Sequence, residues 1–436
     1  MSGGRLRIDP ALALIMVLGP LQWITLADVG LAIKPVHLPL AYGALRGVMR
    51  PSALTGLAPA LFAAAFAAYL GTLTLALFNS ANLGAGLSLL AKLAIHALLT
   101  LGLTLHLARL GRRRIFDSLL FGGAMGALVF LAVASLTLAR QGLSLTGMIG
   151  RALATGDATA LQFRLFLSLF NEGGAGAERT PASLRQVAMG FFYISALGAV
   201  PFLSGARGGR LRVVAVLSLG LSVALIAGSL SRSLVLALGL ALAGLLIARA
   251  GRRADSVLLT LAGLSLVGAL LFSLRETATL FDLISARFDG LDHDGRLLQY
   301  RLTIETIAQA PLIGHGTGHM QEFRAGSRNM VHNLFLSAWV QGGAAGLLTA
   351  LLFSLTLVGL MLGRLVGSRN DLAQLTAALL PILPLLRSQI GGQGGNYALP
   401  EWLAISLTLA ILCRREPVPD PRRIAPANGQ SRPVEA

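Results

Sequence analysis

A histidine and an asparagine stand side by side at positions 332 and 333, where a long polar segment meets an apolar run. His332 could act as a general base, because a neutral imidazole accepts a proton from a hydroxyl group. Asn333 could donate a hydrogen bond beside it, or cap the helix that follows. Gly343 and Gly346 leave part of one face of that helix without side chains, which predicts close packing of a neighbouring helix. A histidine that only faces water or binds a carbonyl group is the alternative.

Arginine is the side chain best suited to hold a phosphate, because its planar guanidinium makes paired, charge-assisted hydrogen bonds. Arg232 lies in a short serine-rich turn between two apolar runs. Its charge therefore falls at the lipid boundary, where the diphosphate of a lipid-linked substrate would sit, although a snorkelling arginine fits the same position. The polar segment 275–332 holds further arginines, some of which must pair with the acidic residues among them: Arg275, Arg287, Arg296, Arg301, Arg324 and Arg328.

Metal and nucleotide sites have little support in the sequence. His315 and His319 lie in a glycine-rich turn that resembles a phosphate-binding loop. Two histidines separated by glycines do not share a helical face, so they predict no zinc site. Asp292 and Asp294 indicate a turn rather than a pair of cation ligands, and the chain has no nucleotide-binding motif. We therefore predict neither a metal nor another cofactor.

The elements that carry these residues are predicted membrane helices. The 436 residues are 55% hydrophobic and 13% charged, with a mean hydropathy of +0.72. Recurring apolar runs predict an all-α, polytopic integral membrane protein with about twelve transmembrane helices. The predicted spans are 11–33, 36–49, 54–78, 84–107, 117–138, 186–204, 211–228, 231–248, 256–274, 333–362, 371–386 and 398–412. The net charge of +17 does not indicate nucleic-acid binding, because the basic residues lie in short turns between spans.

The arginine-rich turns predict an orientation. Threading the chain with its N-terminus in the cytoplasm places most arginines and both termini on the cytoplasmic side. Two long periplasmic segments remain, 139–185 and 275–332, and the second contains a predicted amphipathic helix at 297–309. The membrane domain is assigned to 1–416, and the Pro-rich tail 417–436 is predicted to be disordered.

Three further features concern single residues. Lys92 and Asp28 lie within the predicted spans, where a structural ion pair is favoured and a proton path is the alternative. The single cysteine, Cys413, excludes an internal disulfide. No cleavable signal peptide is evident, because the first apolar run is long and contains Pro20.

The spacing around His332 forms a recognisable motif. His332, Asn333, the stretch 334–342, Gly343 and Gly346 follow the pattern His-(Asn/Ser/Gln)-x9-Gly-x-x-Gly. This pattern resembles the signature of the O-antigen ligase and polymerase superfamily of bacterial membrane glycosyltransferases.

The resemblance continues upstream of the motif. Gly295-Arg296, a predicted helix and the stretch 310–316 are similar to the family's Gly-Arg…Pro-Leu-hydrophobic-Gly-x-Gly element. Ser231-Arg232 is similar to its Ser-Arg element. The similarity covers the signature region 229–362, whereas the N-terminal spans match only in pattern.

The resemblance implies an inner-membrane enzyme with about twelve helices and a large periplasmic loop. The implied donor is a glycan on undecaprenyl diphosphate. Arg232 and Arg296 match the arginines that bind the diphosphate, and His332 matches the histidine proposed to deprotonate the acceptor hydroxyl. Attack at the anomeric carbon would invert its configuration without a metal. Candidate contacts to glycan or phosphate are Arg301, Arg324, Arg328, His319 and Asn333.

The acceptor distinguishes the competing functions. A repeat-unit polymerase of O-antigen or exopolysaccharide would extend a growing glycan, whereas a ligase would transfer a finished glycan to lipid A core. The long segment 139–185, and Val340-Gln341 where the family often has a glutamate, favour the polymerase. A lipid-linked glycan flippase or transporter is a second alternative, but it predicts internal repeats and charges spread through the spans. Membrane lipid and polysaccharide-assembly proteins are the other expected partners.

Overall fold

The structure is a computed structural model of the chain. It describes residues 6–22, 24–28, 32–51, 54, 56–140, 142–155, 181–203, 209–229, 231–249, 295–324, 327–329, 331–367, 371–390 and 397–414. Its helices are α1 (Pro10–Leu18), α2 (His37–Met49), α3 (Leu57–Leu75), α4 (Leu83–Arg109), α5 (Arg112–Arg140), α6 (Leu145–Thr155), α9 (Pro181–Ala199), α10 (Gly209–Gly228), α11 (Arg232–Arg249), α14 (Gly295–Gln309), α15 (Leu334–Gly367), α16 (Leu372–Leu379), α17 (Ile382–Ile390) and α18 (Leu399–Leu412). Two short 3₁₀ helices, η1 (Ala76–Asn79) and η3 (Val200–Phe202), follow α3 and α9.

Two small antiparallel hairpins accompany the helices. Strand β1 (Ala27–Asp28) pairs with β2 (Ala32–Ile33), and β3 (Gln321–Arg324) pairs with β4 (Ser327–Asn329). The sequence analysis predicts neither hairpin, because strands this short show no alternating pattern of apolar residues.

The helical, membrane-protein class is confirmed, but the predicted number of about twelve spans is not. Among the described residues, five helices are long and apolar enough to cross a bilayer: Leu57–Asn79, Leu83–Arg109, Arg112–Arg140, Gly209–Gly228 and Leu334–Leu365. Three shorter apolar helices cover Gln186–Phe202, Ser233–Leu246 and Leu399–Leu412. The predicted span 256–274 and the tail 417–436 lie outside the described residues.

The prediction of one continuous span at 11–33 is wrong. Helix α1 ends at Leu18, and the chain then turns into the β1–β2 hairpin. Pro20 explains the early end, because a proline lacks the N–H group that would continue the helical hydrogen bonds. The predicted span 36–49 is the short helix α2, which packs on α4 with Gly47 against the backbone of Gly102.

The predicted span 371–386 is also broken. It consists of α16 and α17 with Pro381 between them, and α17 extends beyond the prediction to Ile390. The break sets the direction of α17, which carries residues that contact the signature motif.

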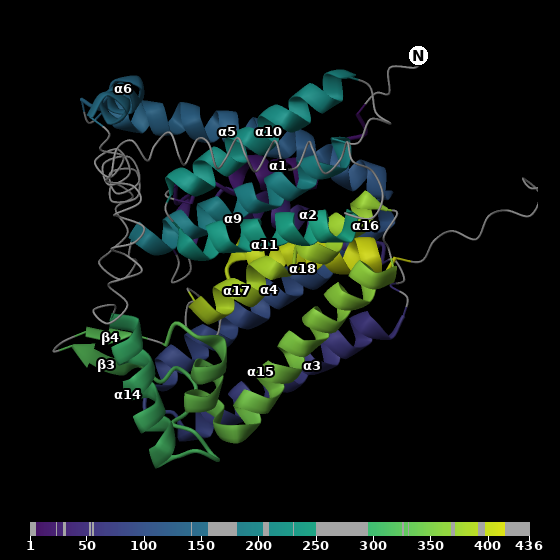
Figure 1. The fold of residues 1–436 in the computed structure, drawn as a ribbon. Coiled ribbons are helices and arrows are strands. Elements are labelled where there is room, and N and C mark those ends of the chain that lie inside the picture. The colour runs from purple at the N-terminus through teal and green to yellow at the C-terminus, as the bar shows by residue number, and fades with distance from the viewer. Residues whose placement is uncertain are drawn as a thin grey trace, which may run out of the picture.

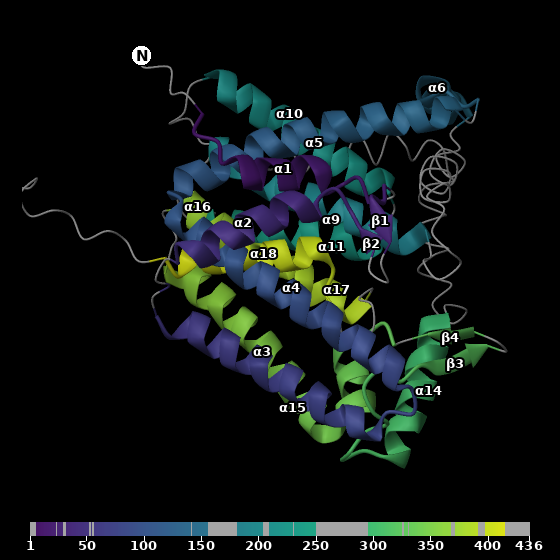
Figure 2. The same cartoon turned by 180° about the vertical axis from the view of Figure 1, so that it is seen from behind.

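Helices far apart in the sequence form one hydrophobic core. Figures 1 and 2 show α3 and α15 running side by side, with α4 beside α3. The contact between α3 and α15 is aromatic: the rings of Phe62, Phe66 and Tyr69 all lie around the ring of Phe353. Such tilted and stacked ring contacts add to the stabilisation that comes from the apolar area buried between the helices.

The bundle has two ends of different character. We call the end that carries α14, β3 and β4 the outer end, and the opposite end, where α4 meets α5, the inner end (Figure 1). Charged contacts join the elements at the inner end: Arg112 Nη1 lies 2.8 Å from Asp371 Oδ2, at the start of α16. Arg364 and Arg414 donate to the carbonyl groups of Leu412 and Leu110. The predicted orientation assigns this end to the cytoplasm.

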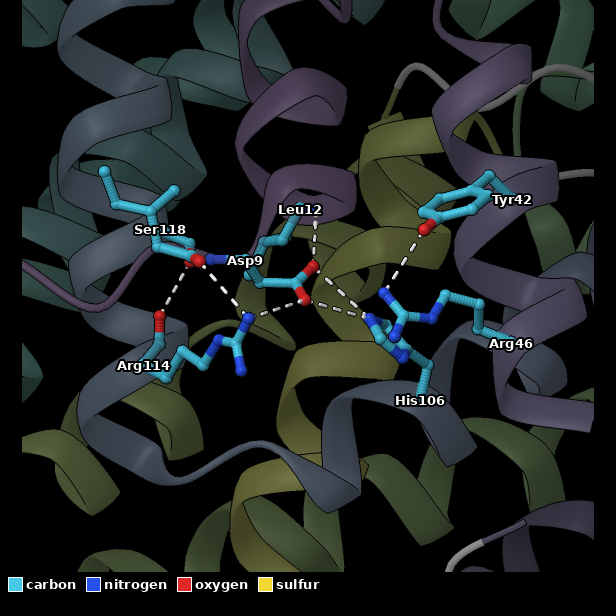
Figure 3. Close-up of polar contacts among 8 residues, drawn as sticks. Asp9, Leu12, Tyr42, Arg46, His106, Arg114 and Ser118 are labelled. Carbon is cyan, nitrogen blue, oxygen red and sulfur yellow. Dashed lines mark hydrogen bonds and ion pairs between the residues drawn. The ribbon is translucent and has the colours of Figure 1, made fainter. Parts of the chain in front are cut away.

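A buried histidine belongs to the inner end. His106 Nε2 lies 3.2 Å from Asp9 Oδ2, and Arg114 Nη2 lies 3.8 Å from the same oxygen (Figure 3). Asp9 also caps α1 by accepting from the N–H of Leu12. Burial raises the pKa of the Asp9 carboxyl, but hydrogen bonds from His106 and Leu12 and the nearby Arg114 outweigh it and leave that pKa below its ordinary value.

Candidate functional site

The helix predicted at 297–309 is confirmed as α14, although Ile304, which its apolar spacing would bury, is exposed. Its buried face docks on the start of α15, where Ile307 packs with Val331 and Val340 in a small hydrophobic cluster separate from the main core. Gln299, on the same helix, is only 4% exposed. Helix α14 therefore presents both an apolar and a polar contact to the signature motif.

His332 and Asn333 lie at the junction of α14 and α15. His332 is half-buried, and its backbone N–H donates to Gln299 Oε1 at 3.4 Å. Asn333 Oδ1 accepts from the N–H groups of Phe335 and Leu336 at 2.9 and 3.0 Å. Asn333 is therefore the N-cap of α15, so it fixes the position at which the helix begins and at which His332 stands.

A third helix, α17, reaches the same place. The carbonyl oxygen of Gln389 accepts from Asn333 Nδ2 at 3.3 Å and from the hydroxyl group of Tyr300 at 3.1 Å. Tyr300 lies on α14 and Asn333 starts α15, so this single carbonyl connects three elements. His332 directly precedes one of the two donors, Asn333, in the chain.

The turn 314–318 is a structural junction. Gly314, Gly316 and Gly318 all have positive φ angles, of 77°, 91° and 84°. A side chain at these positions would also overlap neighbouring backbone: Gln341 at Gly314, Ser80 at Gly316 and Gly86 at Gly318. Glycine meets both demands because it has no Cβ atom.

The backbone N–H groups of this turn already donate hydrogen bonds to other parts of the protein. The N–H groups of His315 and Gly316 donate to the carbonyl groups of Val340 and Gln341 at 2.7 and 3.0 Å. The N–H of Thr317 donates to Ala76, and that of Gly318 donates to the Gln341 side chain. A phosphate-binding loop needs amides that point at its ligand, so these contacts give the turn a structural role.

Gly343 breaks α15 near its start. Its backbone has φ 61° and ψ −153°, a non-helical conformation. A side chain at Gly343 would overlap the carbonyl group of Leu312, and one at Gly346 would overlap the carbonyl oxygen of Ala338. The expectation that these glycines admit a neighbouring helix is therefore wrong, because they admit the 312–314 turn and the first segment of α15 itself.

His315 and His319 lie side by side, with ring centroids 5.1 Å apart. His315 Nε2 lies 2.8 Å from the carbonyl oxygen of Thr306. Burial, together with the nearby His315, lowers the pKa of His319 below its ordinary value. His319 is therefore neutral at pH values where a free histidine begins to charge, which suits a hydrogen bond to a glycan hydroxyl better than a charged contact to phosphate.

The structure describes the side chains of only some of the candidate arginines. Arg301 is largely exposed, and its Nε lies 3.2 Å from Glu305 Oε1, so it forms one of the expected local ion pairs. Arg232 is the first residue of α11, and Arg296 lies in the first turn of α14. Arg324 and Arg328 lie on the β3–β4 hairpin. The side chains of these last four arginines, and all of Arg275 and Arg287, lie outside the described residues.

The predicted ion pair in the spans stays a prediction. Lys92 is half-buried on α4, but the side chain of Asp28 lies outside the described residues. Within the described ranges, no group of three or more His, Cys, Asp or Glu side chains could hold a metal ion.

The sequence analysis misses a second pair of charges. Arg387 on α17 and Glu401 on α18 are only 3% and 1% exposed, with 2.8 Å between Arg387 Nη1 and Glu401 Oε1. It also misses Gln299, Tyr300 and Gln389. One charged residue at the edge of each of two apolar runs is the signal that could have found the pair. The glutamines and the tyrosine carry no such signal.

Comparison with known proteins agrees with this geometry. Residues 217–351 match the family model described as O-antigen ligase. The match contains His332, Gly343 and Gly346 as well as Arg232 and Arg296. It supports the O-antigen ligase and polymerase superfamily, and with it a bacterial membrane protein of glycosyltransferase type. No curated protein matches the chain.

Proposed function

We propose that this protein transfers a glycan from undecaprenyl diphosphate to a sugar hydroxyl, on the periplasmic face of the bacterial inner membrane. We propose further that it acts as a repeat-unit polymerase of O-antigen or exopolysaccharide. The observation that carries the proposal is the placement of His332. It is half-buried where α14 and α15 meet, beside contacts to α17, inside the segment that matches the O-antigen ligase family.

His332 would be the general base. Its imidazole takes the proton of the acceptor hydroxyl while that oxygen attacks the anomeric carbon of the donor glycan. The bond between the anomeric carbon and the diphosphate oxygen breaks, and undecaprenyl diphosphate leaves with the electron pair. Attack from the side opposite the leaving group inverts the anomeric configuration. The imidazolium then releases its proton to water, which restores the base.

Arg232 and Arg296 would hold the diphosphate. Both lie in the first turn of a helix, where the helix dipole disfavours a cation. An anion bound there would satisfy both the arginine and the free N–H groups of the helix start. Charge held in this way stabilises the leaving group as the bond breaks. Arg301, Arg324, Arg328, His319 and Asn333 are further candidate contacts to glycan or phosphate, although the Asn333 side chain already caps α15 and donates to Gln389.

A ligase that joins the finished glycan to lipid A core is the second candidate, and the description of the matching family favours it. The two functions leave different intermediates. A cell without its ligase accumulates long glycans on undecaprenyl diphosphate and bare lipid A core. A cell without its polymerase contains single repeat units.

The test uses a strain that lacks the protein and receives wild type or His332→Ala at matched abundance. Surface glycans are separated on a gel and probed independently for chain length and for attachment to lipid A core. Arg112→Ala, which removes a partly exposed ion pair at the inner end, is the matched control and should show the wild-type pattern. Single repeat units with His332→Ala support the polymerase, and long unattached glycans support the ligase. A wild-type pattern with His332→Ala would overturn the assignment of the base.

A further inference from the structure

A buried ion pair involves α17, the helix that contacts the start of α15 through Gln389. Arg387 and Glu401 come from α17 and α18, and both side chains are almost completely buried. Arg387 Nη1 and Glu401 Oε1 are 2.8 Å apart, yet the contact lacks hydrogen-bond angles. Electrostatic attraction between the two side chains, rather than an aligned hydrogen bond, therefore holds this contact.

The pair is tied to its surroundings on both sides. Arg387 Nη2 donates to Gln186 Oε1 of α9 at 3.3 Å. Glu401 Oε2 accepts from the N–H of Ala398 at 2.7 Å, which fixes the start of α18. The ion pair thus joins three helices at one point.

Arg387 lies two residues before Gln389, which contacts the signature motif. Gln389, whose carbonyl oxygen accepts from Asn333 and Tyr300, is on the same short helix as Arg387. A helix of two and a half turns is stiff over this distance. Movement at Arg387 is therefore carried to the Gln389 carbonyl, and from there to Tyr300 and to Asn333, which adjoins His332 in the chain.

Burying two charges is costly, and a hydrophobic pair of similar volume is often equally stable. Stability alone is therefore a weak reason for an arginine and a glutamate at this place. What this ion pair provides, together with its hydrogen bonds to Gln186 and Ala398, is an attachment of α17 to α9 and α18. We propose that Arg387 and Glu401 are positioning residues, which hold the end of α17 so that Gln389 keeps Asn333, Tyr300 and thereby His332 in the catalytic arrangement. This inference rests on the proposed function of His332.

The test needs variants that fold. Arg387→Ala leaves Glu401 buried without its partner, which destabilises the protein for a trivial reason. The double variant Arg387→Met/Glu401→Gln instead removes both charges, keeps similar volumes and keeps an oxygen that can accept from Ala398. Arg387→Lys retains the charge and serves as the rescue. Arg112→Ala, whose ion pair with Asp371 lies at the inner end, is the matched control.

Two measurements are made on purified full-length protein in liposomes. The first is glycan transfer from an undecaprenyl-diphosphate donor, with kcat expressed per folded molecule. We expect the double variant to lose about 10- to 100-fold in kcat with little change in KM, because displacement of a catalytic group costs about that much. Arg387→Lys should recover much of the loss, and Arg112→Ala should match wild type.

The second measurement is hydrogen exchange in the peptide 331–342, which does not depend on activity. We expect faster exchange there in the double variant and wild-type exchange in Arg112→Ala. Wild-type kcat and wild-type exchange in the double variant would overturn the positioning role, and so would a loss of total activity that disappears once kcat is expressed per folded molecule. If wild type itself transfers no glycan, the proposed function fails, and the exchange measurement alone decides the positioning role.

Discussion

The two ends of the bundle each contain a histidine in a structured setting, and the settings are opposite in kind. At the inner end, His106 is 4% exposed and contacts the carboxylate of Asp9, with Arg114 beside it (Figure 3). At the outer end, His332 is half-buried and is held through its backbone by the neutral side chain of Gln299.

The difference shows what each histidine can do. A histidine fixed against a carboxylate, and closed off from water and substrate, serves to join helices. A half-buried histidine whose backbone is positioned by neutral groups can still approach a hydroxyl group and take its proton. Exposure, rather than the residue type, separates a structural histidine from a candidate base.

The largest expected effect would come from His332→Ala. Loss of a general base typically lowers the rate by about 10²- to 10⁴-fold, so we expect kcat to fall by this amount while the unfolding midpoint stays near wild type. Transfer assays and thermal unfolding of the same liposome preparation measure both quantities. His106→Ala should show the reverse, with loss of folded protein and normal kcat per folded molecule. Equal effects in both variants would remove the distinction between the two ends.

Gly343→Ala should be the most damaging glycine substitution in α15. Gly343 has a positive φ angle, which costs an alanine about 1–3 kcal/mol, and the added Cβ atom would also overlap Leu312. The unfolding midpoint in detergent measures the loss. Gly359→Ala, on the same helix and with open space around it, should be neutral or slightly stabilising. A tolerated Gly343→Ala would contradict the break in the helix.

Asp9→Asn should weaken the inner end in a pH-dependent way. Asparagine still caps a helix, so the variant removes mainly the charge, at a cost of about 1.5–3 kcal/mol for charged hydrogen bonds. The pKa of Asp9 in the folded protein lies below its ordinary value of 3.8. Its stabilisation is therefore present above that ordinary value and is lost as the pH falls through the folded pKa. Unfolding midpoints of variant and wild type should differ at neutral pH and converge in acid, and a constant difference would contradict the charged role.

Arg112→Ala should have the smallest effect. Arg112 and Asp371 are partly exposed, at 28% and 36%, and such pairs contribute about 0–1 kcal/mol. Asp371 would keep its role as the cap of α16, because it accepts from Ala373 and Gln374. Thermal unfolding at low and high salt measures the contribution, which salt should reduce. A larger loss than for Asp9→Asn would mean that the inner end depends on its surface charges.

Part of the fold follows from the sequence because it rests on local properties of the chain. Apolar runs as long as α4 and α5 must be helices, because a helix satisfies all its backbone N–H and C=O groups with internal hydrogen bonds where lipid offers none. The helix at α14 follows from its apolar spacing and from Pro311 after its end. Runs interrupted by proline are harder to interpret, and 11–33 and 371–386 are mispredicted because the apolar composition continues where the helical hydrogen bonds stop.

The sequence by itself determined the set of residues available for chemistry: a histidine after a polar segment, arginines that suit a diphosphate and glycines at fixed spacing. Only the tertiary structure decided how that set is held. It places Gly343, at the break in α15, against the turn 312–314, and it brings Gln389, on the same helix as Arg387, to Asn333 beside His332. The physical reason is that these contacts join segments far apart in the chain. Residue spacing along one segment records helix periodicity, but it carries no information about which carbonyl of a distant helix will accept a hydrogen bond.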